Sequence, residues 1–385
     1  MLQLTPNLPS LVAKRFIAAK ESGTLIFSPT QLTTIQSSGV VFQLRYCPAL
    51  AKKPTPKPED EARREPKPDP FENPPQEMLI AQIPSPHITT STTSGDPTHL
   101  LVLNKFPVIP NHFILATKAF KPQTALLEED DLEMAYACLK AWAAGDNDAD
   151  AASRGGRRRL FGFFNSGDAS GASQPHRHLQ FLPIEDMRGQ EVEAEEGRQG
   201  PAKWVPLIDL LLDSRAATTP EGGFRQLPGL PFLHFALPVP RDPSAETLHR
   251  IYLSLYNAAV RTTQQPRASG QSQEYQTAGE SVIAYNLALT QSAMMICPRR
   301  KDSASLPIQE QSPDENVANV GSVSFNGTIL GGTLMVKAES EWNELRNRPS
   351  SLNSLLSEVG FPVRSENRNV DVNTTEEHNR NKPSI

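Results

Sequence analysis

The sequence has few cysteines and no cysteine motif. The 385-residue chain contains three, Cys47, Cys138 and Cys297, which lie far apart and form no C-x-x-C pair. An odd number of widely spaced cysteines predicts neither a disulfide framework nor a cysteine zinc site. We therefore expect a protein of a reducing compartment, located in the cytoplasm, with the nucleus as a second location.

Long apolar runs, an excess of positive charge and a P-loop are also missing. No apolar run approaches the roughly 18 residues of a membrane span. The formal net charge is −5 at pH 7, whereas a nucleic-acid or membrane partner favours a basic surface. The sequence G-x-x-x-x-G-K-[ST] does not occur, which argues against a P-loop kinase or ATPase. We expect no nucleic-acid partner and no membrane partner, and basic residues that act locally on a phosphate ligand.

Several stretches lack the apolar residues that a core requires. Residues 51–76, AKKPTPKPEDEARREPKPDPFENPPQ, are dense in proline and charge, which predicts a flexible surface loop. A second acidic, glycine-containing stretch, residues 185–201, marks our predicted domain boundary at residue 200. The polar residues 365–385 are expected to form a disordered tail.

Ordered elements are expected where apolar residues follow a regular period. Helical spacing predicts helices over 8–23, 126–145, 245–262 and 341–361, and apolar, β-branched runs predict strands within 78–84, 99–109, 112–120, 160–167, 232–240 and 282–300. The first helix competes with a mitochondrial transit peptide, because Lys14, Arg15 and Lys20 precede the first acidic residue. Its helical apolar spacing favours a core helix.

One segment combines two polar patterns. NSGDASGASQPHRHLQFLP, residues 165–183, carries a Gly/Ser/Ala run followed by His176, His178 and Gln180 at every second position. In an extended segment, a period of two places these three side chains on one face of a strand. That face is then an ordinary exposed strand surface, a metal site, or a nucleophilic site in which a neutral imidazole attacks phosphorus and the turn presents backbone N–H groups to phosphate oxygens.

The third interpretation is the one that uses both halves of the segment. A metal site needs a third good ligand, and Gln180 is a poor one. We therefore expect no metal bound by the protein.

At these residues the chain resembles a known family. SGASQPHRHLQ, residues 170–180, is similar to the signature of the fungal-type diadenosine tetraphosphate phosphorylases (ATP adenylyltransferases). This branch of the histidine-triad superfamily has His-x-His-x-Gln in place of His-x-His-x-His. His99–Gln123 and Ala284–Arg300 resemble the family's preceding hairpin and its C-terminal nucleotide-binding segment. The resemblance extends from about Leu8 to about Pro362.

The resemblance implies both a fold and an activity. The fold is α+β, a histidine-triad-like antiparallel sheet flanked by helices. Residues 1–200 then form the N-terminal catalytic ATP adenylyltransferase domain, and residues 201–364 form a C-terminal adenylyltransferase domain that completes the nucleotide site. The activity is nucleotidyl transfer: inorganic phosphate cleaves diadenosine 5′,5′′′-P1,P4-tetraphosphate to ADP and ATP, reversibly, through an AMP–histidine intermediate.

The same resemblance implies the ligands. Dinucleoside polyphosphates, ATP, ADP and inorganic phosphate are the expected partners, and the resemblance leaves open adenosine 5′-phosphosulfate as a further substrate. No cofactor is required, although Mg²⁺ bound to the polyphosphate would be ordinary chemistry.

In the family pattern His178 is the nucleophile and attacks the α-phosphate, while its other ring nitrogen donates to a backbone carbonyl and fixes the reactive tautomer. His176 has a supporting role. Gln180 holds the α-phosphate oxygens, because an amide donates and accepts hydrogen bonds but supplies no proton to a leaving group. The substrate contacts that the resemblance implies are Lys53, Asn104, Lys105, Asn165, Gly171, Ala172, Ser173, Gln174, Asn286, Thr290, Gln291, Met295 and Arg299.

Taken without the resemblance, several of these residues have simpler interpretations. Lys53 and Lys105 are then ordinary solvated lysines, and Met295 is a core residue. Arg299 is the best suited of the C-terminal set to form a forked contact with phosphate.

Two alternatives stay open. A hexose-1-phosphate uridylyltransferase-like enzyme shares the His-x-His-x-Gln arrangement, although LNKFPVIPNHF, residues 103–113, and the lack of zinc-type cysteines favour adenylyl transfer. A nucleotide-binding sensor without catalytic activity would form no covalent adduct. Detection of an AMP adduct separates these possibilities.

Overall fold

The computed structural model describes residue 4 and residues 7–52, 68–83, 97–145, 157–189, 203–213, 216–220, 222–264, 275–308 and 319–363. Four of the predicted features lie wholly or partly outside these ranges. They are Lys53, residues 53–67 of the proline-rich loop, the predicted boundary at residue 200 and the tail 365–385.

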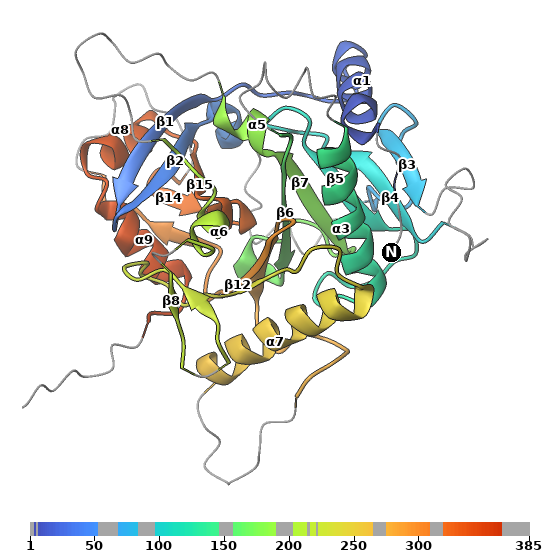
Figure 1. Cartoon of the computed structure of the whole chain (residues 1–385). Helices are drawn as coiled ribbons and strands as arrows, with labels where there is room; N and C mark the ends of the chain where they lie inside the picture. The colour runs from blue at the N-terminus through green and yellow to red at the C-terminus, as the bar shows by residue number, and fades with distance from the viewer. Residues whose placement is uncertain are drawn as a thin grey trace, which may run out of the picture.

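A ten-stranded sheet forms the centre of the molecule (Figure 1), in the order β3-β4-β5-β7-β6-β11-β12-β10-β9-β8. All pairings between neighbours in this sheet are antiparallel. The predicted α+β fold with an antiparallel sheet is thereby confirmed. The strands are β3 Leu79–Ile83, β4 His99–Leu103, β5 Phe113–Thr117, β6 Leu160–Ser166, β7 His178–Pro183, β8 Ala217–Thr218, β9 Arg225–Gln226, β10 Phe235–Pro238, β11 Tyr285–Leu289 and β12 Ala293–Pro298.

The N-terminal and C-terminal parts of the chain meet inside this sheet. Strand β6 pairs with β11, with Asn165 opposite Asn286. The division into residues 1–200 and 201–364 stays a prediction. The structure adds that the two parts share one continuous sheet.

Three long helices cover one face of the sheet. They are α1 Leu8–Glu21, α3 Glu129–Ala144 and α7 Ala245–Thr263, close to the helices predicted from apolar spacing. Their apolar side chains form one buried cluster with sheet residues that include Leu179 and Phe181. The alternation in β7 therefore directs these two side chains toward the helices. None of the helices in the described ranges is long and apolar enough to cross a membrane.

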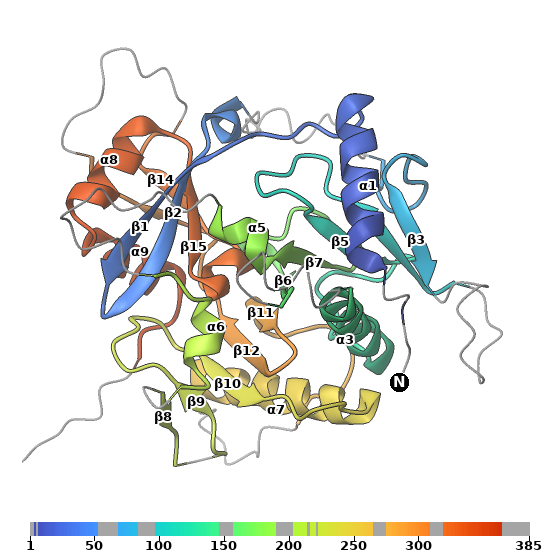
Figure 2. The same ribbon diagram turned by 45° about the horizontal axis from the view of Figure 1, so that its top comes forward.

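A smaller layer covers part of the opposite face. Its three-stranded sheet has the order β1-β2-β15, and β15 is parallel to β2. This three-stranded sheet lies with α8 and α9 on the left of Figures 1 and 2, away from α1 and α3. The elements of the layer are β1 Gln31–Ser37, β2 Val40–Tyr46, β15 Thr333–Val336, α5 Ile184–Arg188, α6 Leu207–Leu210, α8 Glu339–Asn347, α9 Ser351–Val359, the hairpin β13 Ser303–Ser305 and β14 Ser322–Ser324, and the short 3-10 helices η1 Pro48–Lys52, η2 Asp168–Ser170 and η3 Gly327–Gly331.

This layer was only partly predicted. The predicted helix over 341–361 is observed as α8 and α9, because the chain leaves the helical conformation between Arg348 and Ser350. The hairpin β1–β2 was missed, although Ser38 and Gly39, with φ of 52° and 74°, form the tight turn that such a hairpin uses.

A buried ionic cluster fastens the start of β7 to α3. Nη1 of Arg177, just before β7, donates to Asp131 Oδ2 at 2.8 Å, and Nε2 of His99 lies 3.0 Å from Asp131 Oδ1. Burial alone raises the pKa of the Asp131 carboxyl, but the hydrogen bond from His99 and the charge of Arg177 outweigh it, so the pKa lies below its usual value. Asp131 is therefore charged at neutral pH and fixes Arg177 beneath the sheet.

Candidate active site

Polar side chains form a row across the face of the large sheet opposite α3. Directly opposed residues of antiparallel strands lie on the same face, and the pairs His178–Ala116, Gln180–Phe163 and Asn165–Asn286 show this register. His178 and Gln180 therefore share one face of β7, as predicted from the period of two.

The imidazole of His178 is held in one tautomer. Its Nδ1 lies 2.8 Å from the carbonyl oxygen of His176, which can only accept, so Nδ1 carries the proton and Nε2 carries the lone pair. This is the backbone contact expected for a nucleophilic histidine. Burial lowers the pKa of His178 to about 4 and outweighs the hydrogen bond to the His176 carbonyl, which raises it. The imidazole is therefore neutral at pH 7 and can act as a nucleophile.

His176 supports His178 from the side. Its Nδ1 lies 2.6 Å from Oδ2 of Asp69, and its Nε2 lies 2.9 Å from Oγ1 of Thr117. The ring of Phe71 packs against both histidines, with centroid distances of 5.5 Å to His176 and 5.1 Å to His178. The fixed backbone of His176 thereby presents its carbonyl to His178.

The amide of Gln180 is oriented by His112. The Nε2 of His112 lies 3.1 Å from Oε1 of Gln180, and since that oxygen can only accept, His112 is the donor. Burial lowers the pKa of His112 to about 4, so the donor is a neutral ring. The NH₂ group of Gln180 has no hydrogen bond within the described part of the chain and is left for a ligand.

The glycine-rich turn depends on a left-handed residue. Gly171 ends η2 with φ of 78°, and a Cβ there would lie 2.7 Å from the carbonyl oxygen of Phe325. Only glycine accommodates both the backbone conformation and this contact. Ala172, Ser173 and Gln174 continue the irregular turn toward His176, and their phosphate contacts stay predictions.

Asn165, Asn286 and Arg299 form a buried chain of side chains. Oδ1 of Asn165 accepts from Nδ2 of Asn286 at 2.9 Å and from the N–H of Gly327 at 2.9 Å. Nδ2 of Asn286 also donates to the carbonyl of Ser170 at 2.9 Å, and Oδ1 accepts from Arg299. Arg299 donates further to the carbonyls of Lys301, Phe325 and Val359. Its guanidinium thus holds Asn286 in place, and its contact with phosphate stays a prediction.

The other predicted contacts are dispersed. Thr290 and Gln291 lie in the turn after β11, at the opposite end of that strand from Asn286, and Gln291 donates to the carbonyl of Leu139 in α3. Met295 is fully buried in the apolar cluster beneath the smaller layer, which agrees with its simpler interpretation as a core residue.

Asn104 and Lys105 follow β4. The N–H of Asn104 donates to the carbonyl of His112, which places Asn104 beside the residue that orients Gln180. Nζ of Lys105 lies 5.6 Å from the centroid of the Phe106 ring. Lys53 lies outside the described residues.

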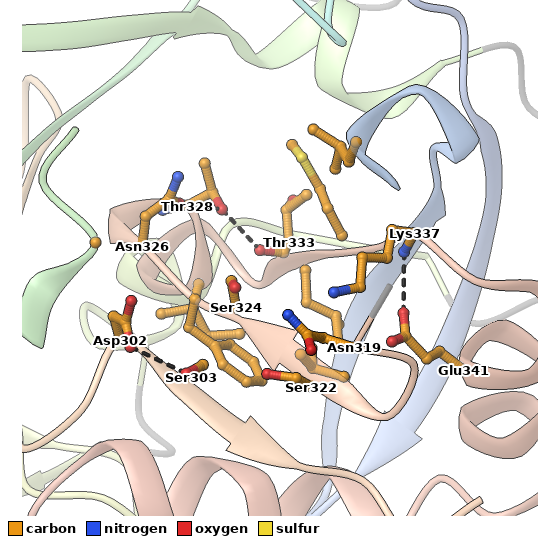
Figure 3. A pocket seen from close by; sticks show the side chains of 17 residues that line it. Asp302, Ser303, Asn319, Ser322, Ser324, Asn326, Thr328, Thr333, Lys337 and Glu341 are labelled. Atoms are coloured by element: carbon orange, nitrogen blue, oxygen red, sulfur yellow. Dashed lines mark hydrogen bonds between the residues drawn. The ribbon is translucent and has the colours of Figure 1, made fainter. Parts of the chain in front are cut away.

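A polar cavity of about 500 Å³ lies beside Gly171. Its walls come from the β13–β14 hairpin, η3 and the end of β15, and Figure 3 shows Lys337 reaching into it. Further polar lining residues include Asp302, Ser303, Ser324, Asn326, Thr328 and Glu341. None of these residues was predicted from the sequence, because they are spread along the chain without a motif.

The site also contains residues that sequence reasoning missed. Asp69, Thr117, Gln123 and His112 all touch the histidines or Gln180. His112 lies within the quoted segment LNKFPVIPNHF, but no periodic signal marks the other three. Within the described ranges, no group of three or more His, Cys, Asp or Glu residues is arranged to hold a metal ion.

Comparison with known proteins covers almost the whole chain. Residues 2–194 match the model of the Ap4A phosphorylase N-terminal domain, and residues 228–362 match that of the ATP adenylyltransferase C-terminal domain. Diadenosine 5′,5′′′-P1,P4-tetraphosphate phosphorylase 2 of Saccharomyces cerevisiae is 28% identical over 368 residues, which cover 92% of this chain and 95% of the relative. Protein APA1 of the same yeast is 27% identical over 372 residues, covering 94% and 96%.

A solved structure also matches nearly the whole chain. The crystal structure of yeast Ap4A phosphorylase Apa2 in complex with Ap4A matches with a TM-score of 0.67 at 25% identity. The match covers 94% of this chain and 99% of that one.

We expect His178 to stay neutral in the free protein until the pH falls to about 4. The unfolded chain binds the same proton near the ordinary histidine pKa of about 6.5. This residue's contribution to stability is therefore complete above about pH 6.5 and is lost progressively as the pH falls toward 4. NMR titration of ¹⁵N-histidine-labelled protein measures the pKa, and His178→Gln identifies the signal. Titration near 6.5 would contradict the buried, neutral ring.

Proposed function

The chain belongs to the Ap4A phosphorylase family of nucleotidyltransferases, and we propose that it cleaves diadenosine tetraphosphate with inorganic phosphate to give ADP and ATP. One observation carries this proposal. The neutral imidazole of His178 has its Nδ1 proton fixed on a carbonyl and its Nε2 lone pair available, next to the glycine-rich turn.

The first half-reaction forms the covalent intermediate. Nε2 of His178 attacks the α-phosphorus, a P–N bond forms, and the P–O bond to the β-phosphate breaks. ATP leaves with the electron pair of that bond. The adenylylated ring carries positive charge, which the hydrogen bond from Nδ1 to the carbonyl of His176 stabilises.

The second half-reaction releases the product. An oxygen of inorganic phosphate attacks the same phosphorus, the P–N bond breaks, and ADP forms while His178 returns to its neutral state. Both steps expel a good leaving group, so no general acid is needed. The NH₂ group of Gln180, oriented by His112, suits this chemistry because it donates to a phosphate oxygen without transferring a proton.

We place the departing nucleotide in the cavity beside Gly171. Its volume of about 500 Å³ lies in the range of small-molecule sites, and its polar lining provides hydrogen bonds for a ribose and phosphates. Lys337 supplies a positive charge there, and the lining also contains the carboxyl groups of Asp302 and Glu341. The cavity borders the turn that leads to His176, so it lies on the side from which a polyphosphate would extend.

The expected roles of Mg²⁺ and adenosine 5′-phosphosulfate and the expected location in the cell are proposals. Mg²⁺ would act as a counterion on the polyphosphate, and no protein cofactor enters the reaction as written. Adenosine 5′-phosphosulfate would adenylylate His178 in the same way, with sulfate as the leaving group. A cytoplasmic location, with the nucleus as the alternative, is supported by three buried cysteines that form no disulfide, and microscopy of the tagged protein tests it.

The alternatives are less favoured. A uridylyltransferase-like enzyme lacks support, because both matched domain models belong to adenylyl chemistry. A sensor without catalytic activity makes no covalent bond, so detection of the AMP adduct would exclude it.

Incubation with diadenosine tetraphosphate in the absence of phosphate should add one AMP group to the wild-type protein. Mass spectrometry of the denatured protein and its peptides locates the group, which we expect on His178. His178→Asn should bind the dinucleotide within a few-fold of wild type but form no adduct, because an amide lacks the nucleophilic lone pair. An adduct elsewhere, or normal turnover by this variant, would refute the assigned role.

Gln180→Glu should slow the first half-reaction by about 10²-fold, the typical effect of losing one donor to a developing charge. The carboxylate still accepts from His112 but repels phosphate. Rapid-quench measurement of adduct formation tests this. The control is Gln82→Glu, which makes the same change at an exposed position of β3. Equal rates for wild type and Gln180→Glu would mean that Gln180 does not face the phosphate.

Lys337→Met should weaken the first half-reaction and spare the second. The substitution removes one positive charge that contacts the departing nucleotide. It should raise the KM for diadenosine tetraphosphate about tenfold, the usual scale for a charged hydrogen bond of ~1.5 kcal/mol. Transfer from the preformed adduct to phosphate should proceed at the wild-type rate, because that nucleotide has already left. Lys20→Met in α1 is the control. Equal effects on both half-reactions would place the departing nucleotide elsewhere.

A further inference from the structure

The side chain of Gln123 bridges the two strands that carry the site. It is buried, with 3% of its surface exposed, and lies in the connection between β5 and α3. Its Oε1 accepts from the backbone N–H of His178 at 2.8 Å. Its Nε2 donates to the carbonyl of Asn165 at 2.7 Å and to that of His178 at 3.2 Å.

This bridge stands where the β6–β7 ladder stops. The paired residues run from Leu160–Pro183 to Phe163–Gln180. Two residues further along, the same register would bring Asn165 opposite His178. There the amide of Gln123 takes the place of backbone pairing, since it accepts from one strand and donates to the other.

A direct backbone pair would satisfy the same N–H and C=O groups. It would need no buried glutamine, whose ordering costs side-chain entropy. The amide instead holds the two strands apart by its own width, at the position where the continued register would place the nucleophile opposite Asn165. Asn165 in turn fixes Asn286 and the N–H of Gly327.

We propose that Gln123 is a positioning residue that sets the gap between His178 and Asn165 into which the α-phosphate enters. This inference rests on the proposed function, because it assigns a geometry to the attack by His178. An amide does not titrate in the working pH range. Gln123 therefore acts on the placement of the nucleophile and leaves its pKa and the pH profile unchanged.

Two variants and one control test the proposal. Gln123→Leu removes all three hydrogen bonds, and Gln123→Glu keeps the acceptor for His178 but loses the donor to Asn165. The control, Gln43→Leu, changes a glutamine that is also buried and also bridges two segments, through Met187 and Thr333. The measurements are the single-turnover rate of adduct formation between pH 5.5 and 8.5, the dissociation constant for diadenosine tetraphosphate, and the melting temperature.

We expect Gln123→Leu to form the adduct at least ~10²-fold more slowly, because a displacement of about 1 Å at the reacting centre has an effect of this size. The loss should be the same at every pH, with a dissociation constant within about threefold of wild type. Gln43→Leu should lower the melting temperature by a similar amount and keep the wild-type rate. Gln123→Glu should also form the adduct slowly. If Gln123→Leu does not fold, Gln123→Glu provides the test by itself.

The outcomes separate this inference from the proposed function. Wild-type protein that forms no adduct overturns the function itself. If the wild-type protein forms the adduct, three results overturn the positioning role alone. They are a wild-type rate of adduct formation in Gln123→Glu, a loss of rate in Gln43→Leu as large as in Gln123→Leu, and a changed pH profile in Gln123→Leu.

Discussion

The rest of the site depends on the hydrogen bond between Nδ1 of His178 and the carbonyl of His176. The ring of His178 is buried, with 3% of the residue's surface exposed, so it is shielded from water and a protein atom fixes its tautomer. Burial keeps the ring neutral, and the carbonyl decides which nitrogen carries the lone pair. The surrounding contacts, from Asp69 to Gln123, hold the backbone that supplies this carbonyl and this ring.

The two faces of the sheet have different tasks. One face is apolar and packs on α1, α3 and α7, which makes β7 rigid. The opposite face has two apolar clusters, one around Phe71 and one beneath the smaller layer, and the polar row on β7, β6 and β11 lies on that face. A charged ligand can approach these side chains without crossing the main core.

The C-terminal part acts on the site through buried side chains. Arg299 holds Asn286, Asn286 holds Asn165 and the carbonyl of Ser170, and Gly327 donates to Asn165. Burial lowers the pKa of the Arg299 guanidinium, and its hydrogen bonds to carbonyls compensate the loss of water. The glycine-rich turn and the C-terminal segment are therefore fixed relative to each other.

The main helices, most strands of the large sheet, the face shared by His178 and Gln180, and the family could all be predicted from the amino-acid sequence. These features follow from local periodicity and from one contiguous motif, because in both cases the residues that carry the signal are neighbours in the sequence. Three features became visible in the folded chain alone: Arg299 holds Asn286, Thr290 and Gln291 lie at the far end of β11, and the motif is surrounded by Asp69, His112, Thr117 and Gln123. The physical reason is that these contacts join residues far apart in the chain. Strand order and register bring them together, and no local pattern encodes either one.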